Sequence, residues 1–208
     1  MQAIGVGARA IFEHYIDLKW LQTFPDELWF ERFRVFATVD QYQSAKKTFD
    51  HAQNNQGRSL IDATQSENFM KRLDRAQPMC EVVGELWGRG KKGQPKWPEH
   101  WTGMSLRERT QAIDAKVGNL YCEDMRVQMY PILSAFVHAG PGPEHLDEVE
   151  REKHVAFAYC NAFLHAANAT EVICDLLAIR EHIVGFDQKM RELTEWHKQA
   201  LQTLPSAF

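Results

Sequence analysis

The sequence lacks any long run of uncharged apolar residues. A membrane-spanning helix needs about 20 such residues, and a secretory signal needs a basic start followed by an uninterrupted apolar stretch. Arg9, Glu13 and Asp17 interrupt the apolar residues near the N-terminus. We therefore expect no signal peptide, no membrane as a partner and a cytoplasmic location.

Cysteine is scarce, and none of the cysteines has a spacing that suggests chemistry. Of the four, no two form a Cys-x-x-Cys pair. Cys160 and Cys174 lie among apolar residues, where free thiols usually pack as small core side chains. This usage is typical of a reducing compartment.

Motifs for metals and nucleotides are also missing. Nine histidines are present, but no Glu-x-x-His and no His-x-x-x-His occurs, so the common helical metal patterns are excluded. A phosphate-binding loop is excluded as well, because Gly90-Lys91 is followed by Lys92 instead of Ser or Thr. We expect no metal and no cofactor. The net charge of −4 argues against a wholly basic nucleic-acid-binding surface but leaves a local patch open.

Helical periodicity is what the sequence does contain. Apolar residues recur at helical spacing through most of the chain, and no alternating strand pattern is found. The pattern predicts an all-α protein, a single domain over residues 1–208 built as a bundle of about six helices. A Trp-, Gly- and Pro-rich loop is expected at 88–103. The expected helical regions are 3–23, 26–51, 59–87, 105–117, 120–138 and 144–204.

Two expected helices carry lines of polar side chains. In 120–138, the polar residues follow one another at intervals of four, which places them on one face. In 3–23, Arg9, Glu13 and Asp17 have the same spacing. If the lines face each other, Glu13 would orient His138 or Arg126 in a cleft, whereas a buried structural ion-pair network would use the same residues. The residues of this candidate site are Arg9, Glu13, Arg126, Tyr130, Ser134 and His138.

The loop at 88–103 combines basic and aromatic residues. Such a combination can hold phosphates and stack bases, so we treat it as a candidate nucleic-acid-binding segment. The alternative, which we prefer, is a flap whose tryptophans plug the bundle while its lysines stay in water. The candidate residues are Arg89, Lys91, Lys92, Lys96, Trp97 and Trp101.

A third polar stripe lies in the region 144–204. His154, Asn161, His165 and Asn168 share one helical face, opposite an apolar face that includes Cys160 and Phe163. We expect the polar stripe to face solvent or a partner and the apolar face to form the core.

Three short segments resemble a bacterial family of helical proteins of unknown function. They are Arg9-Ala-Ile-Phe-Glu13, Trp101-Thr-Gly-Met-Ser105 and the segment Tyr130 to His138. The resemblance implies an all-helical fold with a shared polar pocket and implies no established activity. The chain also shows a weaker similarity to HEPN-type helical ribonucleases, whose mark is Arg, four to six residues, then His. Arg9 with His14 and Arg191 with His197 fit that spacing, and chance supplies about as many pairs.

The leading functional hypothesis is a cytosolic helical-bundle protein of this unknown-function family. If its polar pocket is catalytic, we expect metal-independent acid–base chemistry on RNA, in a defence or toxin setting. His138 would act as acid or base, Arg9 and Arg126 would hold phosphate, and Glu13 would orient. The alternatives are a non-enzymatic protein-interaction module and a small-molecule-binding bundle. RNA, a partner protein and a second copy of the chain in a homodimer are the expected partners, and whether the protein is an enzyme stays open.

Overall fold

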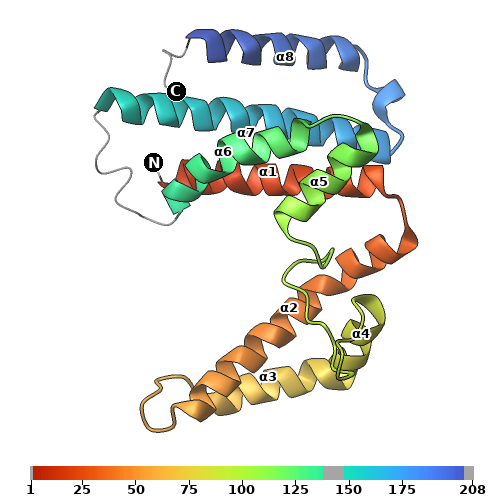
Figure 1. Ribbon diagram of the computed structural model, residues 1–208, viewed down its shortest axis with the longest axis vertical. Coiled ribbons are helices and arrows are strands. Elements are labelled where there is room, and N and C mark those ends of the chain that lie inside the picture. Colours follow the sequence, from red (N-terminus) through yellow and green to blue (C-terminus); the bar gives the residue numbers. More distant parts are fainter. Residues whose placement is uncertain (1, 138–147, 204–208) are drawn as a thin grey trace. The chain divides into compact units, whose positions relative to one another are not determined.

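The computed structural model describes residues 2–137 and 148–203 and shows helices joined by turns and loops (Figure 1). Within these residues the only extended pairing is an isolated bridge between Arg89 and Pro95, so the all-α prediction is confirmed. The elements are α1 (Gln2–Thr23), α2 (Glu27–Asn54), α3 (Ala63–Ala76), α4 (Met79–Leu86), α5 (Leu106–Val117), α6 (Tyr121–Val137), α7 (Glu148–Leu176), the 3₁₀ helix η1 (Arg180–His182) and α8 (Phe186–Thr203).

The prediction of about six helices is too low, because two of the expected regions are divided. Pro78 separates α3 from α4, since proline cannot donate the hydrogen bond that a continuous helix needs. The region 144–204, in which the sequence indicates a break near Gly185, is divided there: the 3₁₀ helix η1 lies between α7 and α8. The division of this last region positions α8 beside α7.

The described residues form two compact units. Unit 1 combines residues 1–24 with residues 106–208, and unit 2 comprises residues 25–105. The prediction of a single domain stays a prediction, because two compact units can still unfold together as one domain.

Unit 1 is organised around α1. This helix packs against α5, α6 and α7, and α7 also packs against α8. Ala8, Phe12 and Ile16 follow at intervals of four and are at most 2% exposed, so they share one buried face. The small Ala158 of α7 lies in the same core cluster as Ala8, which lets the two helices approach closely. Burying Phe12 and Ile16 stabilises unit 1 by roughly 1.5–3 kcal/mol each.

The start of α6 is fixed by a side chain from α5. Asp114 is 2% exposed, and its two carboxylate oxygens accept hydrogen bonds from the backbone N–H groups of Cys122 (3.0 Å) and Glu123 (2.7 Å). The first N–H groups of a helix have no partner within the helix, so such a carboxylate satisfies two of them. Asp114 thereby sets the position of α6 against α5.

Unit 2 consists of α2, α3, α4 and the loop predicted at 88–103. Its core joins Val39 and Tyr42 of α2 to Met79 and Val83 of α4. Leu28 and Phe33, in the first turns of α2, are 40% and 54% exposed. The burial of α2 begins only at Val35.

Candidate functional site

The structure brings the predicted pair Arg9 and Glu13 together with Tyr130. Arg9 Nε donates to Glu13 Oε1 at 2.8 Å, and Arg9 Nη2 donates to the Tyr130 hydroxyl. The guanidinium carbon also lies 4.6 Å from the centre of the Tyr130 ring. The polar lines of α1 and α6 therefore do face each other at these three residues.

Two further residues, which the sequence analysis did not place in the site, extend this arrangement. Arg109 of α5 donates to Asp17 of α1, and its side chain is only 4% exposed. Burial lowers the pKa of Arg109, and the Asp17 and Glu13 carboxylates offset that effect. We refer to Arg9, Glu13, Asp17, Arg109 and Tyr130 as the polar cluster.

The protonation states in the polar cluster follow from its partial burial. Burial, together with the nearby Glu13 carboxylate, raises the pKa of Tyr130, so its hydroxyl keeps its proton at neutral pH. The hydrogen bond from Arg9 to Glu13 raises the pKa of Arg9 against the opposing effect of burial. Arg9 and Arg109 are thus positively charged and each contacts a carboxylate.

The remaining candidates on α6 are placed differently. Arg126 forms two hydrogen bonds to Glu123, at 2.8 and 2.7 Å, so Glu123 is its carboxylate partner and the idea that Glu13 orients Arg126 is wrong. The bond to Arg126 lowers the pKa of Glu123 to about 2. His138 and the side chain of Ser134 lie outside the described residues, so their predicted roles stay predictions.

The candidate nucleic-acid-binding loop divides into packed and exposed residues. Trp101 is 3% exposed, and its carbonyl oxygen accepts a hydrogen bond from Trp87 Nε1 at 2.7 Å. Trp97 stacks on Tyr42 with ring centres 5.4 Å apart. Stacking a base on Trp101 would require a ring exposure that this residue does not have. The four basic residues of the loop are exposed, namely Arg89, Lys91, Lys92 and Lys96.

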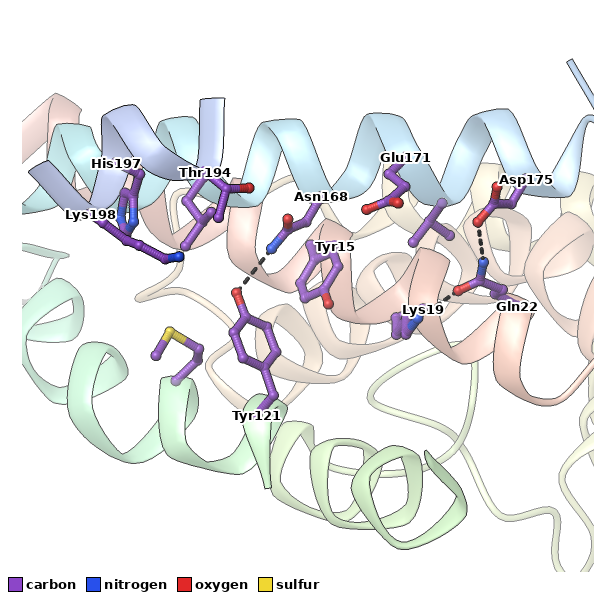
Figure 2. A pocket seen from close by; sticks show the side chains of 13 residues that line it. Tyr15, Lys19, Gln22, Tyr121, Asn168, Glu171, Asp175, Thr194, His197 and Lys198 are labelled. Atoms are coloured by element: carbon purple, nitrogen blue, oxygen red, sulfur yellow. Dashed lines mark hydrogen bonds between the residues drawn. The ribbon is translucent and has the colours of Figure 1, made fainter. Parts of the chain in front are cut away.

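Sequence reasoning missed a pocket of about 630 Å³ in unit 1 (Figure 2). It lies between α1, α6, α7 and α8, and Met125, Leu164 and Val172 supply apolar wall. The other lining residues are Tyr15, Lys19, Gln22, Tyr121, Asn168, Glu171, Asp175, Thr194, His197 and Lys198. We call this space the α7–α8 pocket.

Tyr121 presents a hydrogen-bond donor to the α7–α8 pocket. Asn168 Nδ2 donates to the Tyr121 hydroxyl oxygen at 2.9 Å, drawn as a dashed line in Figure 2. Because the hydroxyl accepts this bond, its own hydrogen is left to bond another group. Burial raises the pKa of Tyr121, so the hydrogen is retained at neutral pH.

His197 contributes a buried ring to the same pocket. Its side chain is 7% exposed, and its Nε2 has no hydrogen-bond partner among the described residues. Burial lowers the pKa of His197, so the ring is neutral at neutral pH. A buried polar group of this kind is costly to leave unpaired. Nε2 itself has almost no accessible surface, so the ring lines the pocket through its other atoms.

The polar stripe predicted on α7 does not face solvent. His165 is fully buried and Asn161 is 3% exposed, whereas Phe163, expected in the core, is 44% exposed. The prediction was wrong because α1 packs along this side of α7. Asn168, the last member of the stripe, lines the α7–α8 pocket.

The two acidic residues of the pocket wall already form ion pairs. Glu171 and Asp175 contact the guanidinium of Arg180 at 3.0 and 3.1 Å. Gln22 donates to Asp175 at 3.0 Å and accepts from Lys19 at 2.7 Å. Lys19 and Lys198 are the lysines of the wall.

Two further features are absent from the described part of the chain. No helix there is long and apolar enough to cross a membrane. Among the same residues, no three His, Cys, Asp or Glu side chains are grouped as ligands for a metal ion.

Comparison with known proteins gives a family and no activity. No curated protein and no solved structure matches the chain significantly. The sequence pattern of the family of unknown function DUF5677 matches residues 4–153. That range includes the whole polar cluster, whereas most of α7 and all of α8 lie beyond it. The match confirms the resemblance to a helical family of unknown function, and the chain is a member of DUF5677.

Proposed function

We propose that the protein binds a small molecule in the α7–α8 pocket. The observation that carries this proposal is a pocket of about 630 Å³ whose wall combines apolar side chains with the Tyr121 hydroxyl, which is held by Asn168. Ligand sites usually have volumes of about 300–1,000 Å³, and they combine an apolar wall with a few placed polar groups. Met125, Leu164 and Val172 supply that apolar wall here.

The apolar and the polar residues of the pocket wall contribute to ligand binding in different ways. The apolar side chains exclude water from the body of a ligand, which contributes roughly 25 cal/mol for each Å² of apolar surface removed from water. Tyr121, held by its bond to Asn168, offers a hydrogen bond of fixed direction. Asn168 acts as a positioning residue, because it orients the Tyr121 hydroxyl.

The test is a fragment screen by ligand-observed NMR with two matched variants. Leu164→Trp fills the pocket, and Ala166→Trp places the same ring on an exposed position of the same helix. Fragments that bind the wild type should bind Ala166→Trp and fail to bind Leu164→Trp, while circular dichroism shows both variants folded. Fragments that bind all three proteins equally, or a screen without any binder, would contradict the proposal.

A metal-independent ribonuclease is the second candidate. The contact between Arg9 and Tyr130 favours it, because this contact draws together the two polar lines from which the site was predicted. Against it, Arg9 and Arg109 each contact a carboxylate, so phosphate would have to displace Glu13 or Asp17. We also propose, alongside this candidate, a role in defence or as a toxin. RNA, a partner protein and a second copy of the chain in a homodimer are its proposed partners.

Incubation with total RNA in EDTA tests the ribonuclease candidate. The wild type should cleave, His138→Ala should lose cleavage, and Tyr130→Phe should weaken it through the lost contact with Arg9. The absence of cleavage by the wild type, or equal cleavage by all three proteins, would remove this candidate and leave the binding proposal standing.

A further inference from the structure

The polar groups of the α7–α8 pocket are unevenly distributed. Figure 2 shows Lys198, His197 and Tyr121 at one end, and Glu171 and Asp175 toward the other. Lys198 and Tyr121 come from opposite walls, α8 and α6, and their polar ends point toward each other in this view. One end of the pocket thus gathers a positive charge and a hydroxyl donor.

The two hydrogen-bond donors at this end, Tyr121 and Lys198, can each donate to a ligand. The Tyr121 hydroxyl accepts from Asn168, so its own hydrogen is left to bond another acceptor. The Lys198 ammonium donates to Glu195 at 2.7 Å, but both side chains of this pair are about 60% exposed. An exposed pair of this kind contributes only about 0–1 kcal/mol, so a ligand can replace Glu195 at little cost.

The other end of the pocket, which contains Glu171 and Asp175, is less favourable for an anion. Its carboxylates, Glu171 and Asp175, would repel a negative group, and Arg180 already contacts both of them. Lys19 also lies toward this end (Figure 2), but it already donates to Gln22 at 2.7 Å, so we expect a ligand with one negative charge to be favoured at the Lys198 end. A second negative charge would extend toward Glu171 and would be disfavoured, since like charges repel most strongly where water is excluded.

Resting on the proposed function, we propose that the pocket binds a monocarboxylate with an apolar body. One carboxylate oxygen accepts from the Tyr121 hydroxyl and the other accepts from the Lys198 ammonium. The neutral His197 ring lines the same end of the pocket. The apolar body lies against Met125 and Leu164 of the wall.

Three probes with the same phenylalkyl body and end groups of different charge test this inference. They are 4-phenylbutyrate, 4-phenylbutanamide and 4-phenylbutylamine, titrated into the full chain by isothermal calorimetry or NMR. Because hydrogen bonds to a charged group are stronger than neutral ones, the butyrate should bind about tenfold more tightly than the amide. The amine should bind most weakly, because Lys198 repels it.

Substitutions connect the preference to the named residues. Lys198→Met should reduce the affinity for the butyrate about tenfold and leave that for the amide unchanged. Lys189→Met, which removes an exposed lysine of the same helix outside the pocket, should leave both affinities unchanged. Tyr121→Phe keeps the ring and should also weaken the butyrate selectively.

The outcomes separate this inference from the proposed function. Equal binding of the butyrate and the amide, tighter binding of the amine, or an equal effect of Lys198→Met and Lys189→Met overturns the carboxylate assignment. If none of the three probes binds, the assignment also fails. In each of these cases the small-molecule proposal is decided separately by the fragment screen and the Leu164→Trp variant.

Discussion

His165 is a titratable residue in a fully buried position of α7. Its ring lies 4.9 Å from the ring of Phe12 and 5.7 Å from that of Tyr15, measured between ring centres, and Nε2 is 3.3 Å from the sulfur of Met129. Burial, and secondarily the nearby His197, lowers the pKa of His165 from 6.5 to about 4. The residue thus acts as a neutral aromatic side chain that packs α7 against α1.

We expect His165 to make the protein less stable as the pH falls from 6.5 to about 4. In this interval the unfolded chain binds a proton at His165 that the folded chain does not bind, so the free energy of unfolding decreases. The loss is on the order of 2–3 kcal/mol, and it is absent above the unfolded pKa. Urea denaturation of the wild type and of His165→Phe over this pH range measures the difference.

The variant retains an aromatic ring and removes the titration. Its stability should therefore fall less steeply with decreasing pH than that of the wild type, whatever its stability at neutral pH. Parallel curves for the two proteins would show that His165 is not the source of the pH dependence.

At the scale of elements, the junction of α5 and α6 depends on one carboxylate. Asp114→Ala removes the acceptor for the backbone N–H groups of Cys122 and Glu123. Because this end of α6 is partly buried, the lost bonds should cost about 2–3 kcal/mol. Asp124→Ala removes an exposed carboxylate from the first turn of the same helix and should cost less than about 1 kcal/mol. Denaturant titrations of the two variants provide the comparison, and equal losses would contradict the capping role.

Helix type was predictable from the sequence because apolar spacing is a local signal. Ala8, Phe12 and Ile16 repeat at intervals that only a helix places on one side. Which side of a helix is buried depends on the helices packed against it, as α7 shows. Its polar stripe at Asn161 and His165 looks like a solvent face by composition, but the packing of α1 buries it.

Contacts of the candidate site were predictable from the sequence where the two residues are close in sequence. Arg9 and Glu13 are one helical turn apart, so their pairing follows from spacing alone. Arg109 and Asp17 are 92 positions apart, and no local pattern connects them. Arg126 had a visible partner three residues earlier, Glu123, that the sequence reasoning overlooked in favour of Glu13. The wall of the α7–α8 pocket is built from four helices, so no single segment of the sequence predicts the pocket.

At the scale of the whole molecule, unit 2 is inserted between two parts of unit 1. The core of unit 1 joins α1 to α6 and α7, and the core of unit 2 joins α2 to α4. The contact of Asp17 with Arg109 holds the two ends of the insertion near each other. From Asp17 to Phe24 the helix rise is roughly 10 Å, and from Arg109 to Leu106 roughly 5 Å.

We expect unit 1 to fold when residues 25–105 are replaced by a flexible linker. About eight Gly and Ser residues reach up to about 27 Å, which is enough to join Phe24 to Leu106. The shortened chain should keep its helical circular dichroism signal and a cooperative thermal transition, because each side chain in the Ala8–Met129–Ala158 cluster comes from unit 1. If the shortened chain instead loses cooperative unfolding, and the full chain melts in one transition, unit 1 needs unit 2 and residues 1–208 behave as the single domain predicted from the sequence.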